Sequence, residues 1–302
     1  MLANAALILP DFALIALGFV LFRRFGYERG FWVGLERLVY YVLFPALLFN
    51  SIVSAKYSLA DDGGLLVAGV GGLLAAALLG FAARPLLRPP AALFASCLQT
   101  TYRYNSYLGL ALAQSLAGSR GVAQLALIFS ACIPLANLIA VSTMARHSQA
   151  GLARELMRNP LIIGTLSGLA GNVIGLQLPQ FATQALGRLG QASLALGLIC
   201  VGAGLTLAGA ATHRLLLGWF SAVKLLLFPM VALGLAWLLG LPREQAQIAI
   251  VFAALPTATT AYVLATRMGF DGAPVSFLIT AQTLASMLTL PVWVALASRL
   301  FA

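Results

Sequence analysis

The sequence predicts an all-α integral membrane protein with ten transmembrane helices, arranged as two inverted five-helix repeats. Only 9% of the 302 residues are charged and 61% are hydrophobic, whereas a soluble protein carries about 25% charged residues. Apolar stretches recur along the whole chain, each close to the roughly 20 helical residues that cross a hydrocarbon layer. The longest connector lies near the middle of the chain, with five such stretches on either side.

The first repeat, 1–145, contains five apolar stretches. They are bounded by charged residues or by Gly and Pro clusters, and they lie at 5–22, 35–55, 63–83, 91–116 and 121–145. No Lys or Arg precedes the first stretch, while Arg23 and Arg24 follow it, which favours a retained span over a signal peptide. In the third stretch, Gly72, Ala76 and Gly80 have the spacing at which helix backbones approach closely.

The second repeat, 146–302, opens with the basic connector 146–159. Its apolar stretches lie at 160–178, 189–211, 215–239, 246–266 and 273–298. Because five is an odd number, the second repeat must cross the membrane in the opposite sense to the first, as in many secondary transporters. The pairs Gly164/Gly168 and Gly171/Gly175 predict further faces for helix packing.

The net charge of +10 predicts the orientation of the chain rather than a nucleic-acid partner. The basic residues stand singly or in pairs between apolar stretches, with no basic stripe. Eleven fall on the side of Arg23: Arg23, Arg24, Arg29, Arg37, Arg84, Arg88, Arg146, Arg154, Arg158, Arg214 and Arg267. Five fall on the other side: Lys56, Arg120, Arg188, Arg243 and Arg299. The positive-inside rule then places both termini outside the cytoplasm.

The residue inventory gives no indication of an enzyme, a metal site or a cofactor. Cys97, Cys132 and Cys200 each stand alone in an apolar stretch and are expected to be packing residues. His147 and His213 lie in basic connectors, so no span offers a nucleophile with a histidine base.

Nine consecutive polar residues, 99–107, occupy the middle of the fourth stretch. An unbroken helix of nine residues turns about two and a half times, so some of these side chains would face lipid. Unsatisfied polar groups there cost several kcal/mol each. The run therefore predicts an interrupted helix that lines a protein-enclosed cavity; a hydrogen-bond network between helices is the alternative.

Arg103 lies near the centre of its span, where placing an arginine in the membrane costs about 2.5–3.5 kcal/mol. None of the acidic residues lies in the middle of a stretch, and Asp11 comes closest. A central cation without an acidic neighbour favours an anionic substrate, and a guanidinium fits a carboxylate well. Arg103 could instead be structural, donating to carbonyls freed by the break. For Lys224 in the eighth stretch, snorkelling and cavity lining both stay open.

The ninth stretch contains Pro256 followed by Thr257, Thr260 and Tyr262. Pro256 removes one N–H group and frees the carbonyl four residues earlier, which predicts a second helix break. Two broken helices at corresponding places of two repeats indicate a binding site near the membrane midplane, where helices four and nine would cross. Their half-helix N-termini would offer N–H groups to an anion.

At this point the chain resembles the auxin efflux carrier family in its bacterial branch. Five segments carry the resemblance by their order and spacing: 38–49, 103–109, 158–163, 256–265 and 283–291. Asn105 matches the family asparagine of the fourth helix and Pro256 the crossover proline of the ninth. Ala111 stands where many members have proline.

The resemblance implies a homodimer with scaffold helices 1, 2, 6 and 7 and a moving transport domain of helices 3–5 and 8–10. It also implies elevator-type transport of small organic anions, such as auxin, malate or malonate, in the bacterial inner membrane. A coupling proton or sodium ion is left open, and a cation–proton or sodium-coupled carrier is the alternative. The candidate substrate-binding residues are Asn50, Arg103, Asn105, Ser106, Tyr107, Asn137, Pro256, Thr257, Thr260, Tyr262 and Thr283.

Overall fold

The computed structural model describes residues 2–53, 59–144, 160–205 and 213–301, and all regular elements in these ranges are helices. Six described stretches are long and apolar enough to cross a membrane: Arg29–Val53, Asp62–Leu87, Ala91–Met144, Gln180–Ala203, Arg214–Leu238 and Ala273–Leu300. They contain most of the described residues of the second to fifth, seventh, eighth and tenth expected spans. The expected connector 146–159 lies outside the described residues.

The other three expected spans are also helical. The first lies within α1 (Leu2–Arg24), the sixth corresponds to α9 (Pro160–Val173), and the ninth is divided into α13 (Arg243–Ala254) and α14 (Thr260–Arg267). The structure thus confirms an all-helical chain with the apolar helices of an integral membrane protein.

Several helix ends differ from the sequence-based bounds, and those of α9 and α10 (Gln180–Ala203) have a clear local reason. α9 ends at Val173 instead of 178, because the chain turns at Gly175, which has φ +67°. Gly175 is therefore a turn residue and not part of the packing face expected from its spacing with Gly171. α10 begins nine residues before the expected 189. Its first turns are polar, so a search for apolar residues does not include them in the span.

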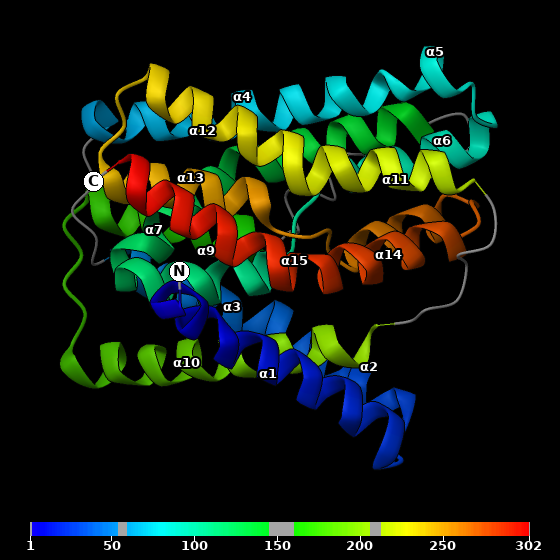
Figure 1. Cartoon of the computed structure of the whole chain (residues 1–302). Helices are drawn as coiled ribbons and strands as arrows, with labels where there is room; N and C mark the ends of the chain where they lie inside the picture. The colour runs from blue at the N-terminus through cyan, green and yellow to red at the C-terminus, as the bar shows by residue number, and fades with distance from the viewer. Residues whose placement is uncertain (1, 54–58, 145–159, 206–212, 302) are drawn as a thin grey trace.

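One group of helices consists of α1, α2 (Arg29–Leu38), η1 (Val39–Leu43), α3 (Phe44–Val53), α9 and α10. Within it, α1 and α10 lie together along the lower edge of Figure 1. Their backbones touch: a Cβ on Gly18 would lie 2.0 Å from the Ile199 carbonyl oxygen, and one on Gly202 would lie 1.8 Å from the Ile15 carbonyl oxygen. No side chain larger than hydrogen fits at either position.

α9 packs against α3 through the glycine face that its sequence predicts. A Cβ on Gly164 would lie 2.8 Å from the Pro45 Cα, and one on Gly168 would lie 3.0 Å from the Ile52 Cβ. This face is therefore covered by the chain's own α3.

The second group of helices follows the upper part of Figure 1. Its members are α4 (Leu59–Phe81), α5 (Ala83–Leu87), α6 (Ala91–Leu98), α7 (Ser106–Met144), α11 (Arg214–Ala222), η4 (Val223–Leu227), α12 (Phe228–Leu238), α13, α14 and α15 (Ala273–Leu300). The predicted small-residue face of α4 is confirmed: a Cβ on Gly72 would lie 3.0 Å from the Phe228 ring, and one on Gly80 would lie 2.7 Å from Thr101 Oγ1.

Two wide π-helical turns, η1 and η4, each come directly before a Phe-Pro pair. A proline ring clashes with the carbonyl four residues earlier, and a wider turn relieves that clash. Pro45 and Pro229 are thus accommodated by local widening of the helix.

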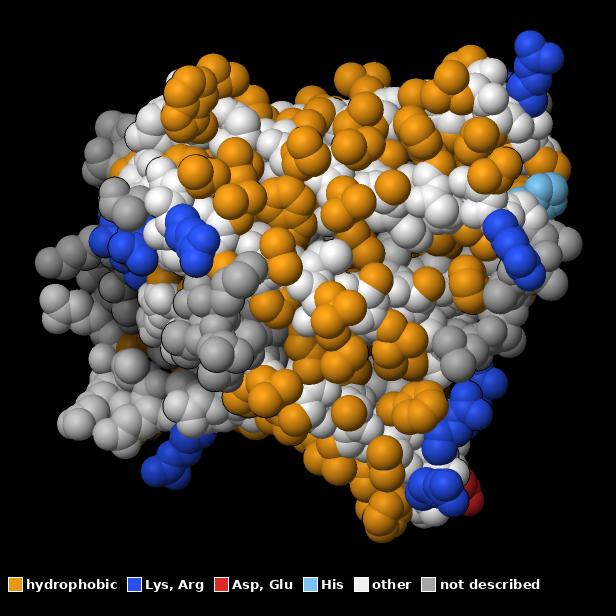
Figure 2. All heavy atoms as spheres, in the orientation of Figure 1, with side chains coloured by type: hydrophobic (Ala, Val, Ile, Leu, Met, Phe, Trp, Pro, Cys, Tyr) orange, Lys and Arg blue, Asp and Glu red, His pale blue; other side chains and the backbone are white. Residues whose placement is uncertain are grey.

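Figure 2 shows one face of the molecule, with hydrophobic side chains across its middle and Lys and Arg side chains towards its margins. Large exposed apolar residues include Leu78, Met230 and Leu288, which are 70%, 56% and 77% exposed. A surface of this kind suits contact with lipid.

Candidate functional site

The fourth span is interrupted inside the polar run. α6 ends at Leu98, a single 3₁₀ turn η2 (Gln99–Thr101) follows, and α7 begins only at Ser106. Thr100 Oγ1 donates to the Cys97 carbonyl at 2.7 Å, and Thr101 Oγ1 donates to the Leu98 carbonyl at 2.9 Å. These hydroxyls satisfy carbonyls at the end of the half-helix, so the polar residues support the break as predicted.

Asn105 begins the second half of this span as a helix cap. Its Oδ1 accepts hydrogen bonds from the backbone N–H groups of Tyr107 at 3.1 Å and Leu108 at 3.2 Å. This is the role in which asparagine is favoured before a helix. The side-chain oxygen is thus used to cap α7, and the amide nitrogen is the part of Asn105 that suits an anion.

The ninth span breaks at the predicted proline. α13 ends at Ala254, Leu255 is extended with ψ 137°, and α14 starts at Thr260. The residue before a proline avoids the helical region, and the proline lacks an N–H donor, so the local sequence dictates this break.

The two breaks contact each other directly. The Asn105 N–H donates to the Pro256 carbonyl at 2.8 Å. Thr257 Oγ1 lies 2.8 Å from the Thr100 carbonyl oxygen and 2.7 Å from Gln282 Oε1 on α15, so its single proton is shared between two good acceptors. The Thr257 N–H also donates to Gln282 Oε1 at 3.3 Å. Helices far apart in sequence therefore meet at one buried polar junction.

Arg103 lies within this junction and is 9% exposed. Its guanidinium donates to Asn137 Oδ1 on the second half of α7 and to Thr260 Oγ1, at 3.4 Å, at the start of α14. The structure thus brings together three of the candidate residues, and both acceptors are neutral groups. A guanidinium carries five N–H donors in a planar fork, so it can donate to an anion in addition to these two groups.

The remaining candidates lie in three different environments. Tyr107 stacks on Phe44 of α3 at a ring distance of 4.5 Å, and so joins the two groups of helices. Asn50 and Ser106 are half-buried, on α3 and at the start of α7. Tyr262 is 38% exposed on α14. Thr283 is buried and donates to the Ile279 carbonyl of its own helix at 2.7 Å.

The sequence analysis did not predict Gln282, and it included Gln99 only as part of the polar run. Gln99 Nε2 donates to the Ala261 carbonyl on α14 at 3.0 Å, which ties the first break to the helix that follows the second. A signal for Gln282 was present, because an amide in the middle of an apolar span is expected to hydrogen-bond to another helix.

Lys224 does not snorkel. Its side chain is fully buried, and its Nζ lies over the Phe228 ring, 4.5 Å from the ring centre.

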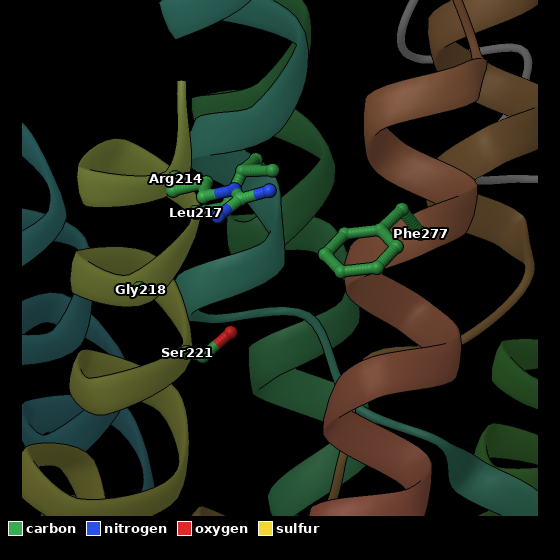
Figure 3. A pocket seen from close by; sticks show the side chains of 5 residues that line it. All are labelled: Arg214, Leu217, Gly218, Ser221 and Phe277. Atoms are coloured by element: carbon green, nitrogen blue, oxygen red, sulfur yellow. The ribbon is translucent and has the colours of Figure 1, made fainter. Parts of the chain in front are cut away.

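An open pocket lies elsewhere on the second group of helices. It has a volume of about 390 Å³ and is lined by Arg214, Leu217, Gly218, Ser221 and Phe277. Figure 3 shows Arg214 and Ser221 on α11 facing Phe277 on α15 across the space. None of the candidate substrate-binding residues lines this pocket.

Comparisons with known proteins identify the family of the chain. Residues 6–294 match the model of the family described as "Membrane transport protein". A "Putative malonate transporter" from Rhizobium meliloti (strain 1021) is 26% identical over 296 residues, covering 94% of this chain and 92% of the relative. Since the family model spans nearly the whole chain, the protein belongs to this membrane transport family, the auxin efflux carrier family that its motifs resemble, and is a membrane transporter rather than an enzyme.

Proposed function

We propose that this protein carries small organic anions, with dicarboxylates such as malonate as the leading substrate class. The observation that carries the proposal is the position of Arg103, a nearly buried arginine at the junction of two broken helices, where it donates to Asn137 and Thr260. An arginine in such a place attracts a carboxylate and can bind it in a bidentate manner. The name of the similar protein from Rhizobium meliloti supports the same substrate class.

The helix breaks add to this preference. α7 and α14 both begin at the junction, and helix N-termini carry partial positive charge that favours anions. The N–H groups of Tyr107 and Leu108 are occupied by the Asn105 cap, so Arg103 and the Asn105 amide nitrogen are the stronger candidates for direct contact.

The proposed transport cycle is elevator-type alternating access across ten spans in two inverted repeats, with the broken fourth and ninth helices crossing at the membrane midplane. In it, the group of helices that contains α4, α7, α13 and α15 moves the junction relative to the group that contains α1, α3, α9 and α10. Among the described helices, α1, α3, α9 and α10 pack mainly on one another, which supports this division, and α7 contacts both groups. The Tyr107–Phe44 stack lies between them and would have to slide or separate during the cycle.

A binding screen tests the proposed function. Purified full-length protein is heated in mild detergent with malonate, malate, indole-3-acetate or chloride at matched ionic strength. A bound ligand at 100 times its dissociation constant should stabilise the fold by about 2.7 kcal/mol. We expect a carboxylate to raise the melting temperature where chloride does not.

Two arginine variants assign the effect to the site. Arg103→Gln should abolish the carboxylate-induced shift, whereas Arg188→Gln, the same change at an exposed arginine of α10, should retain it. Equal stabilisation of wild type and Arg103→Gln would show that the anion is bound elsewhere.

A further inference from the structure

Lys224 occupies an unusual position for a charged residue. It lies in the wide turn η4, its side chain is fully buried, and within the described part of the chain its Nζ has no hydrogen-bond acceptor. The face of the Phe228 ring lies next to it, with the ring centre 4.5 Å from Nζ.

The described elements that pack against η4 carry their acidic residues only near helix ends. η4 packs against η2, α4, α13 and α15, as well as its own neighbours α11 and α12. The charged residues of these helices stand at their ends: Asp61 and Asp62 near the start of α4, Arg214 at the start of α11, Arg243 and Glu244 at the start of α13, and Arg299 near the end of α15. Cys132 on α7 is the titratable group that interacts electrostatically with Lys224.

An ammonium ion in this place loses its hydration and, among the described residues, gains neither a counter-ion nor a hydrogen-bond acceptor, which is a large cost. The interaction with Phe228 offsets only part of that cost. A neutral amine on the same side chain avoids it. The two protonation states of Lys224 therefore differ strongly in how well this interior accepts them, and added negative charge nearby would change the balance.

The anion site lies on the other side of a short series of aromatic rings. Phe228 is 5.7 Å from Phe252 between ring centres, and Phe252 is 4.6 Å from Tyr104, the residue that follows Arg103. Because these groups are buried, a charge placed at Arg103 is poorly screened at Lys224.

We propose that Lys224 is the proton-binding group that couples proton uptake to anion binding. When a carboxylate binds at Arg103, the Lys224 amine takes one proton from solution and becomes an ammonium ion, which compensates one negative charge of the substrate. The carrier then moves the anion together with a proton. This inference rests on the proposed function.

Proton uptake can be counted directly. Malonate is added to weakly buffered, purified full-length protein containing a pH indicator, above the pH range in which malonate itself titrates. Wild type should take up about one proton for each malonate bound. Its affinity should correspondingly weaken by about tenfold per pH unit where the free protein holds the amine and the complex holds the ammonium.

Three variants identify the proton-binding group. Lys224→Met should bind malonate without proton uptake and with an affinity that no longer depends on pH. Lys224→Arg places a permanent cation at this position. Because an arginine is already protonated, this variant too should bind malonate without proton uptake. Cys132→Ala removes the neighbouring thiol and should still take up a proton.

The outcomes separate this inference from the proposed function. Malonate binding to wild type without proton uptake, or equal uptake by wild type and Lys224→Met, would overturn the role of Lys224 and leave the anion site intact. Malonate binding without proton uptake is measured on wild type alone, so it tests the inference even if Lys224→Met misfolds. Loss of uptake in Cys132→Ala alone would assign the proton to the thiol. A wild-type protein that binds no carboxylate at all would overturn both proposals.

Discussion

The backbone N–H of Asn105 donates to the carbonyl of Pro256 at 2.8 Å, so the break in one helix is completed by the break in another. Each interruption leaves backbone groups that its own helix no longer satisfies. Thr257 adds a second connection, from its hydroxyl to the Thr100 carbonyl. The two breaks are therefore interdependent, and a substitution at one should also destabilise the other.

The first prediction concerns Thr257→Val. The variant keeps the shape of the side chain but leaves the buried Thr100 carbonyl and Gln282 Oε1 without this donor. We expect the free energy of unfolding to fall by about 1–3 kcal/mol, measured by chemical unfolding in mild detergent. Thr283→Val is the matched control, because the Thr283 hydroxyl donates within its own helix and should matter less. Equal losses would show that the junction does not depend on Thr257.

The second prediction treats Arg103 and Asn137 as a coupled pair. Arg103→Gln, Asn137→Leu and the double variant form a cycle, and the direct hydrogen bond between them predicts a coupling energy of about 0.5–3 kcal/mol in the ligand-free protein. Thermal unfolding without ligand measures it. Additive effects would show that the contact between Arg103 and Asn137 adds nothing to stability.

The third prediction concerns the contact between α1 and α10. Gly18→Ala and Gly202→Ala place a Cβ against backbone that cannot move aside locally, so each should destabilise the protein by about 1–3 kcal/mol or more. Gly234→Ala on α12 has open space at its Cβ and should be neutral or stabilising by up to about 1 kcal/mol. If all three variants unfold at the same temperature, the close approach of the two helices is not required.

The fourth prediction is that both termini are extracytoplasmic. Ala3→Cys and Ala302→Cys should react with a membrane-impermeant thiol reagent in intact cells, while Gly30→Cys, beside the basic turn after α1, should react only after lysis. The reason is the bias of basic residues towards the side of Arg23 and Arg24. The opposite labelling pattern would invert the orientation.

The fifth prediction is a homodimer through the group of helices that contains α1, α3, α9 and α10. The reason for this prediction is the resemblance to the family. The glycine face of α9 does not add to it, because that face is already covered by α3 and cannot contact a second chain. Multi-angle light scattering in several mild detergents should give the mass of two chains. A single-chain mass in all of them would remove the dimer.

The positions of the helix breaks were predictable because their causes are local. Pro256 cannot continue a hydrogen-bonded helix, and nine consecutive polar residues cannot all be satisfied on one membrane helix. The partners were not predictable: Thr257 and Gln282 are 25 residues apart and Arg103 and Thr260 are 157 apart, so only the packing of whole helices decides which acceptor each donor meets. Lys224 is a similar case, since its sequence allowed snorkelling and only the fold shows full burial.

The backbone contact between Gly18 and Ile199 also sets an order of assembly. At synthesis rates of about 5–20 residues per second, the α10 surface emerges roughly 10–40 s after Gly18 does. During that interval α1 has been made, but α10, whose backbone packs against Gly18, has not. The contact between α1 and α10 can therefore form only after α10 has been synthesised, which makes it a late event in the biogenesis of the protein.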